Sequence, residues 1–544
     1  MRTSSIRRLF FALLILGLMA VLAVGVNAQD GTSIRIFPND RADPTYIAHG
    51  AITGTNEALF NALHCSLVNL DENYMIQPDL ASSFTLSEDE TVYTFSLDPD
   101  AKWHDGTPVT AADVEFTWVA YATPEAVTGS RIRPLVMTSV VGGEDVVASA
   151  AEAASYAETT KYSGIEIVDD HTINFTLTGA NPLWLITSSQ SPNGYILPKH
   201  ILGDIPYAEW RAQPIYGEAP LGCGPYQFVQ HVEGQFVELA AFADYHLGAP
   251  KIDRVFFMNW LTQDVGVAQI QSGELDVMLG ITPSDADRLS RETDAQILTT
   301  AAAAAYQLSV NTFRIPDPRV RLAMAYALDR EAILDAIFLG QGRVQECCFL
   351  NDWAIPEGQT PYPYDPAMAR QLLAEAGWDS SQELTILFPT AYRLSDSLVP
   401  ILQQQLAEVG INTVIDAQEQ TAFREKLINT RDWDLFFNQG ANMLPDPGSF
   451  TVWECPTGGS PQSGWFYCDD KMADLYVIGR TTADFAARQA AYQAIQTIFY
   501  EEMPTVNIVV PYTIFAVQQR VEGITPTANR AAVTWNIYDW TVTE

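Results

Sequence analysis

A strand pattern followed by an amphipathic helix stands out at residues 309–331, which read SVNTFRIPDPRVRLAMAYALDRE. Asp317 can cap the helix N-terminus, and Pro318 suits the first helical position. Apolar residues then recur at helical spacing on one face, namely Val320, Ala323, Met324, Ala327 and Leu328. The pattern predicts a strand that leads into a helix packed against a larger body.

Strand and helix patterns alternate through most of the chain. Alternating apolar and polar residues predict strands at 33–37, 83–86, 91–97, 164–177, 236–240, 254–260, 383–388, 411–418 and 504–517. Cap and stop signals predict helices at 57–68, after Thr110, from Ala268, from Asp365 to Gly377, from Ser395 or Asp396 to Gly410, and at 483–501. This order predicts a mixed α/β protein.

The N-terminal segment has a pattern of its own. Arg2, Arg7 and Arg8 precede an apolar run at 9–26, and Val-Asn-Ala at 26–28 resembles a cleavage site. We expect residues 1–28 to be an export signal that is removed, although the run approaches the length of an uncleaved membrane anchor. No cysteine lies near the cleavage point, so we do not expect a lipid anchor.

Composition narrows the partners. The chain has 544 residues, 47% of them hydrophobic, which is ordinary for a large globular protein with several domains. Its formal net charge is −36, and such a surface repels nucleic acid and anionic lipid. We therefore expect no nucleic-acid partner.

Several stretches resemble the signatures of one protein family. Residues 311–330 fit N-T-x-x-x-P-D-P-R-V-R-x-A-x-x-x-A-x-D-R, and residues 103–117 fit W-x-D-G-x-P-x-T-A-x-D-V-x-F-T. Further similar stretches are 364–378, the D-W-D-L at 432–435, and LGCGPYQF at 221–228, where a cysteine replaces the usual threonine. The chain therefore resembles the peptide/nickel-type solute-binding proteins of ABC importers, called family 5.

The resemblance implies a clamp of the periplasmic binding protein-like II class, with two mixed α/β lobes plus an inserted small lobe. It implies a signal peptide at 1–28, lobe I in parts at 29–73, 206–308 and 515–544, the small lobe at 74–205, and lobe II at 309–514. It also implies that the segment at 504–517 returns the chain to the first lobe.

Six cysteines in an exported chain permit disulfides. Cys455 and Cys468 flank a loop rich in proline, glycine and serine, so we predict a bridge between them. Closing so short a loop is worth ~3 kcal/mol in the chain-entropy model. Pairing stays open, with buried thiols as the alternative, for Cys65, Cys223, Cys347 and Cys348.

No catalytic or metal-binding constellation is evident. The chain has no GxSxG and no HExxH, and its seven histidines lack ligand spacing. We therefore expect no cofactor, and nickel is disfavoured. Two carboxylates of a glycosidase could still lie anywhere among the 66 acidic residues, so a secreted hydrolase that acts on an oligomeric substrate is the alternative function.

The resemblance also places a ligand site. In peptide-binding members an aspartate shortly before a D/E-P-x-[SN]-F motif pairs with the α-amine of the ligand. The motif here is residues 446–450, and Met443 stands at the position of that aspartate. A free ammonium would lose a charge-assisted hydrogen bond worth ~1.5–3 kcal/mol. Asp446 could substitute through a local shift, or serve only as a turn residue.

We expect the residues around this motif to line the cleft. The candidates are Gln439, Gly440, Asn442, Met443, Trp453 and Trp465, with His49 and Asn507 as weaker choices. Packing under the loop at 455–468 is the alternative for the two tryptophans. The methionine at position 443 makes a dipeptide a weaker candidate and favours an oligosaccharide or a blocked peptide, because amides and tryptophan faces hydrogen-bond and stack on sugars well.

The function that follows is that of an exported receptor. It would capture a peptide or an oligosaccharide between its lobes and deliver it to a membrane permease, as a monomer. Its location would be the periplasm or cell surface, free or tethered through an uncleaved N-terminal segment. A signalling receptor fits the same features, and the sequence does not identify the solute.

Overall fold

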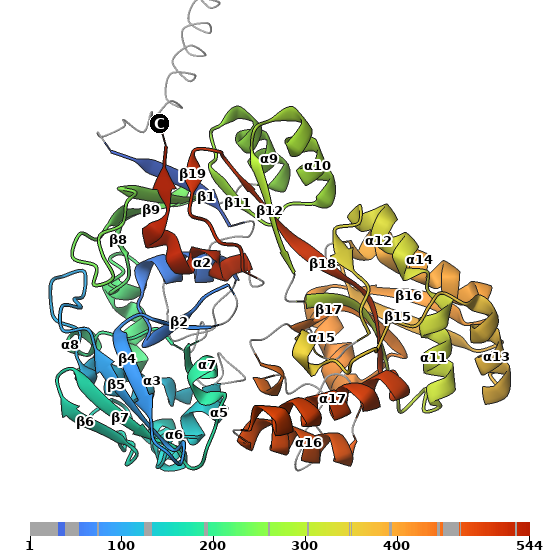
Figure 1. Cartoon of the computed structure of the whole chain (residues 1–544), viewed down its shortest axis with the longest axis horizontal. Coiled ribbons are helices and arrows are strands. Elements are labelled where there is room, and N and C mark those ends of the chain that lie inside the picture. Colours follow the sequence, from blue (N-terminus) through green and yellow to red (C-terminus); the bar gives the residue numbers. More distant parts are fainter. Residues whose placement is uncertain are drawn as a thin grey trace, which may run out of the picture.

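A computed structural model shows the chain as two bodies that share one long strand, β18 (Thr505–Val517) (Figure 1). The structure describes residues 31–38, 54–72, 75–124, 133–189, 194–258, 262–301, 304–346, 349, 351–390, 394–442, 446–449, 467, 469–482, 484–527 and 530–543. The expected signal at 1–28 lies outside these residues.

The first body is built around strand β1. This strand pairs in parallel with β10 on one side and β11 on the other, and β9 and β8 continue the sheet as antiparallel strands. Ile34 and Ile36 belong to the same buried cluster as helix α2, while Phe37 packs with α9 and α10 on the opposite face. The bounds are β1 (Ser33–Phe37), α2 (Gly54–Leu63), β8 (Tyr226–Val232), β9 (Phe236–Ala241), β10 (Arg254–Met258), α9 (Gln263–Ser272), β11 (Val277–Leu279) and α10 (Pro283–Glu292).

A smaller antiparallel sheet lies beside this one, in the order β4-β5-β7-β6. Helix α3 begins at a capping box, in which the Thr110 N–H donates to Asp113 Oδ2 at 2.9 Å, as the sequence predicts. The core between this sheet and its helices is aromatic, with Trp118, Phe175 and Trp184 in mutual contact. The elements are β4 (Ala81–Leu86), β5 (Val92–Leu97), α3 (Ala111–Tyr121), α5 (Arg133–Thr138), α6 (Gly143–Glu152), β6 (Ile165–Asp169), β7 (Thr172–Thr176) and α7 (Trp184–Ser189).

Short elements connect the two sheets of this side of the molecule. They are β2 (Val68–Leu70), β3 (Ile76–Pro78), α8 (Lys199–Leu202), η1 (Tyr207–Ala212) and η2 (Pro214–Tyr216). After β18 the chain ends in β19 (Val521–Glu522), η7 (Arg530–Asp539) and β20 (Thr541–Val542), and η7 packs on α2.

The second body contains the sheet order β16-β15-β17-β13-β18. Asp317 caps α11 by accepting from Arg319 N–H, and Gly377 ends α13 at φ +67°, both as predicted. The strands are β13 (Ala304–Val310), β14 (Gly342–Arg343), β15 (Glu383–Pro389), β16 (Asn412–Gln418) and β17 (Leu435–Asn442). The helices are α11 (Pro318–Ala327), α12 (Arg330–Phe338), η3 (Asp352–Ala354), α13 (Pro366–Ala376), α14 (Ser395–Glu408), α15 (Gln420–Arg424), η4 (Glu425–Thr430), η5 (Pro447–Ser449), α16 (Asp470–Thr481) and α17 (Phe485–Glu502).

Strand β18 joins the two bodies. Its first part, 505–509, pairs with β13 in the second body, and residues 512–517 pair with β12 (Gln296–Ala301) in the first. Between these parts, Val510 and Pro511 pair with β14. The strand thus changes partners within a few residues, and one backbone is common to both sheets.

The structure departs from the sequence predictions around Leu63. The predicted helix at 57–68 ends there: the Leu63 carbonyl accepts from Gly224 N–H at 3.0 Å, and neither Gly222 nor Gly224 has room for a β-carbon beside it. Cys65 and Cys223 form a disulfide at the same place, a pairing that the sequence left open. The predicted bridge between Cys455 and Cys468 lies outside the described residues.

Two other elements differ from prediction in extent. Helix α9 begins at Gln263 rather than at Ala268, because the Thr262 side chain caps it through Val265 N–H. The stretch at 123–160, which gave no clear pattern, contains α5 and α6. The boundaries expected for the lobes stay predictions.

Candidate binding site between the lobes

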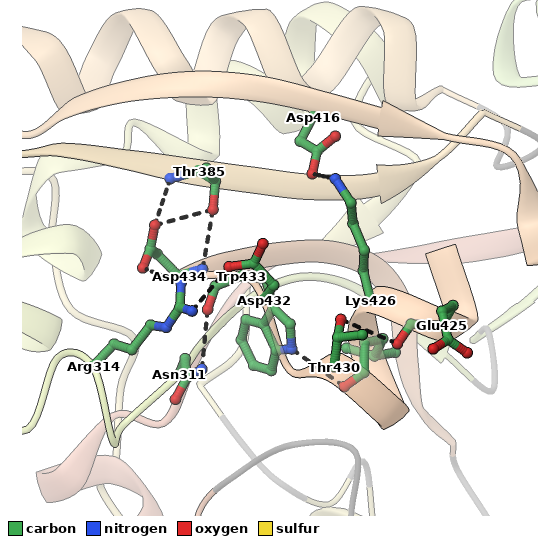
Figure 2. Close-up of polar contacts among 11 residues, drawn as sticks. Asn311, Arg314, Thr385, Asp416, Glu425, Lys426, Thr430, Asp432, Trp433 and Asp434 are labelled. Carbon is green, nitrogen blue, oxygen red and sulfur yellow. Dashed lines mark hydrogen bonds and ion pairs between the residues drawn. The ribbon is translucent and has the colours of Figure 1, made fainter. Parts of the chain in front are cut away.

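The signature residues at 311–330 and 432–435 hold the second body together (Figure 2). Asn311 donates to the Trp433 carbonyl at 3.0 Å, and Arg314 donates to Asp432 and Asp434, also at 3.0 Å. Asp434 in turn accepts from the N–H and the hydroxyl of Thr385, at 2.8 and 3.0 Å. These contacts tie β13, β15 and β17 together where β17 begins, so this part of the signature fixes the sheet.

Arg321 has a similar role inside the same signature. Its guanidinium is buried and donates to the carbonyls of Ile315, Pro316 and Glu502 at 3.0, 2.7 and 2.7 Å. It also forms an ion pair with the Glu502 carboxylate at 2.8 Å. Arg321 therefore anchors α11 to the end of α17 and is not available to a ligand.

The candidate site lies at the other end of β17. Gln439 and Gly440 lie opposite Tyr306 and Ala305 of β13, Asn442 lies opposite Ala304, and the Gln439 side chain is exposed. On the opposite edge, β15 pairs with β17 only at Leu435 and Phe436. Within the described part of the chain, the C-terminal half of β17 thus has a neighbouring strand on one side only.

Asp446 belongs to the turn that follows this strand. Its carboxylate is buried, accepts from Gly448 N–H at 2.9 Å and forms an ion pair with Arg488. Burial raises the pKa of Asp446, while Arg488 acts in the opposite direction. Arg480 binds the Gly448 carbonyl at 2.8 Å. Asp446 therefore serves as a turn residue whose carboxylate is bound within the second body. This is the second of the two roles that the sequence allowed, the first being an amine-binding carboxylate.

The same turn touches the opposite side of the molecule. A β-carbon built on Gly448 would overlap Cδ1 of Leu183, which directly precedes α7 in the small-lobe segment, and it would also overlap the Tyr492 hydroxyl of α17. Leu183 is buried. The two bodies therefore meet at Gly448.

Asn507 is completely buried on β18 and has hydrogen-bonded partners. Its Oδ1 accepts from Gln307 Nε2 at 3.0 Å, and its Nδ2 donates to the Gln345 carbonyl at 3.0 Å. Of the other sequence candidates, His49, Met443, Trp453 and Trp465 lie outside the described residues, as does the side chain of Asn442.

The sequence analysis did not single out Leu183, Gln307 or Asn438. Strand alternation could have placed Gln307 beside Ser309 on one face of β13, but nothing local pairs it with a residue 200 positions away. Leu183 is one apolar residue among many.

Among the described residues, no group of three or more histidine, cysteine or acidic side chains could hold a metal ion. The helices of the described segments include none that is both long and apolar enough to cross a membrane.

Two α/β bodies that share a strand, with a small antiparallel sheet added to one, define a clamp of the periplasmic binding protein type II class. The chain belongs to the bacterial extracellular solute-binding proteins of family 5, whose family model matches residues 75–461. The family and fold expected from the signatures are therefore confirmed.

Relatives and solved structures agree with this assignment. A protein of Brucella ovis described as an ABC transporter peptide-binding protein is 30% identical over 383 residues, which cover 69% of this chain and 67% of the relative. The oligopeptide-binding protein AppA of Bacillus subtilis is 24% identical over 484 residues, covering 85% and 83%. The crystal structure of CtaP, an ABC transporter substrate-binding protein from Listeria monocytogenes, has a TM-score of 0.80 at 26% identity and covers 95% of this chain and 100% of its own. These proteins are binding proteins, so the comparisons give the hydrolase alternative no support.

Proposed function

We propose that this protein is the receptor of an ABC importer and captures an extended peptide between its lobes. The observation that carries this proposal is that, among the described residues, the C-terminal half of β17 pairs with a strand on one side only. This half of the strand ends beside the turn where the two bodies meet. An extended peptide can pair with such an edge through its main chain, which gives affinity without depending on side-chain identity.

Capture would then be coupled to closure. A peptide on β17 would contact the second body directly and the first body across the gap, so its binding energy would favour the closed population. The contact between Leu183 and Gly448 belongs to that closed arrangement. The permease would receive the peptide from the closed form, with the receptor acting as a monomer.

The residues that would follow the peptide are those at the end of β17 and in the loop beyond it. We assign Gln439, Gly440, Asn442 and Met443 to the path of the ligand main chain, and Trp453 and Trp465 to its side chains. His49 would contribute from the first body. Asn507 would support the site through its hydrogen bond with Gln307, since its own side chain is buried.

The proposed location is outside the cytoplasmic membrane. It rests on the basic and apolar pattern of residues 1–28 and on membership of an extracellular family. Mass spectrometry of the exported protein, with an N-terminus at Gln29 or at Met1, distinguishes a released receptor from a tethered one.

Thermal unfolding against panels of short peptides and oligosaccharides tests the ligand class. A ligand at 100 times its dissociation constant adds ~2.7 kcal/mol to the stability of the folded state. Peptides should raise the midpoint and be recovered intact by mass spectrometry. A shift with oligosaccharides alone would replace peptide by sugar as the ligand, and time-dependent accumulation of cleaved product would restore the hydrolase alternative.

A further inference from the structure

A row of buried amide side chains crosses three neighbouring strands near the C-terminal end of β17. Asn438, Gln307 and Asn507 are register partners on β17, β13 and β18. They are 6%, 0% and 0% exposed, respectively. They share one face of the sheet, because the alternate residues Phe437 and Leu308 belong to the core on the opposite face.

The hydrogen bonds fix which way two of these amides point. The Gln345 main-chain carbonyl can only accept, so the NH2 group of Asn507 must face it. Oδ1 of Asn507 is then the atom that faces Gln307, and Gln307 must present its own NH2 group there. Gln307 Oε1 is thereby directed away from β18.

The row ends in two acceptors that have no partner. Gln307 Oε1 and Asn438 Oδ1 are both buried without a hydrogen bond. The next polar pair on this face behaves differently, because the Ser309 and Thr505 hydroxyls bond each other at 2.9 Å. A buried carbonyl oxygen without a donor is unfavourable, so these two oxygens favour a donor supplied from elsewhere.

The surroundings indicate from which side a donor can arrive. On the face of β17 that carries Asn438, Phe436 lies two residues before it and packs on Trp433. Gly440 lies two residues after it and has no side chain. Beyond Asn507, the other end of the row is closed by the buried ion pair of Arg330 and Glu346. Asn438, at the end of the row beside Gly440, has the largest exposed fraction of the three residues, so a donor would approach the row from that end.

We propose that Asn438 and Gln307 form a subsite for an ammonium or guanidinium group of the ligand, a conclusion that rests on the proposed peptide-binding function. Such groups carry several donors and no acceptor, so they can satisfy both oxygens without leaving a ligand acceptor unpaired. A sugar hydroxyl would bring its own lone pairs into the buried site.

The cation has two sources in a peptide, and matched ligands separate them. Tetraalanine against its N-acetylated form tests the α-ammonium. An acetylated tetraalanine with lysine at its second position, against the same peptide with norleucine, tests a side-chain ammonium. Calorimetric dissociation constants are measured for the full exported chain, for Asn438→Leu and for Asn438→Asp, with Asn412→Leu on the far edge strand β16 as the matched control.

We expect the intact protein to bind the cationic member of at least one pair about 10-fold or more tightly, as a charge-assisted hydrogen bond implies. Asn438→Leu should reduce that ratio to near one, Asn438→Asp should raise it about 10-fold, and Asn412→Leu should leave it unchanged. Equal binding of both members by the intact protein, or a preference that survives Asn438→Leu in a folded variant, would overturn the subsite. Failure of every peptide to bind would instead overturn the proposed function.

Discussion

Leu183 and Gly448 come from opposite bodies of the clamp and lie so close together that a β-carbon on Gly448 would overlap Cδ1 of Leu183. The two bodies therefore approach each other closely at a position that has no side chain.

Gly448→Ala should weaken ligand binding by hindering closure. Since the added methyl also meets the Tyr492 hydroxyl within the second body, two double variants separate the effects. Adding Leu183→Ala should recover affinity, whereas adding Tyr492→Phe should recover only thermal stability. Calorimetry and small-angle scattering with and without ligand measure both properties. Recovery of affinity by Tyr492→Phe alone would contradict a role for the interlobe contact.

Arg321→Met should destabilise the second body strongly. The substitution removes the guanidinium that binds three carbonyls and Glu502, and a buried carbonyl left without its donor costs about 1–3 kcal/mol. Arg321→Lys should rescue little, because one ammonium cannot reproduce the planar fork. Urea unfolding measures the effect. Arg319→Ala is the matched control: its ion pair with Asp317 is largely exposed, and we expect a loss under ~1 kcal/mol.

Loss of the disulfide between Cys65 and Cys223 should lower stability substantially. The bridge closes a loop with a sequence separation of 158, and chain entropy assigns about 5 kcal/mol to a loop of this size. Reductant should therefore lower the thermal midpoint of the intact protein. The double variant Cys65→Ser, Cys223→Ser should show the lower midpoint and no response to reductant. Because both cysteines are buried, the double variant decides the matter: a midpoint equal to that of the intact protein without reductant would mean that the bridge contributes nothing.

Acid should destabilise the protein through His64 and His104. Burial lowers the pKa of His64 to about 3 and that of His104 to about 4, while an unfolded histidine titrates near 6.5. The unfolded chain therefore binds more protons between pH 6.5 and 4, and stability falls as the pH falls through this window. Across this window, His64 alone should lower the free energy of unfolding by about 3 kcal/mol.

The comparison of wild type with His64→Gln isolates this contribution from the buried carboxylates. Asp113, Asp276, Glu346 and Asp446 have pKa values raised by burial, so each changes stability with pH in the opposite direction. Denaturant midpoints at pH 7 and pH 4.5 should differ less in the variant. An unchanged difference would show that His64 is not a buried neutral group.

The elements that were predicted correctly carry their signals within a few residues. Helix boundaries were predicted from local signals, and the structure has them. The helix starts are marked by Asp317 with Pro318 and by Thr110 with Asp113, and one helix end is marked by Gly377. The family signatures added the fold class, and Asn311, Arg314 and Arg321 of one signature hold strands and helices of the second body together.

The features that were missed depend on residues far apart in the chain. Cys65 pairs with Cys223, Gln307 with Asn507, and Leu183 meets Gly448, and none of these pairs has a local signal. The early end of α2 has the same cause, since the loop containing Gly222 reaches Leu63 from more than 150 positions away. These features are therefore set by contacts between distant parts of the chain, and at the end of α2 such a contact overrides the local helical pattern.

The late position of β18 has a consequence for biosynthesis. Residues 505–517 follow every other strand of these sheets along the chain, yet both sheets need them. Until that point, β13 in one body and β11 and β12 in the other lack a strand that covers their edges. A nascent chain would therefore hold two unfinished sheets, and its final segment would complete both together.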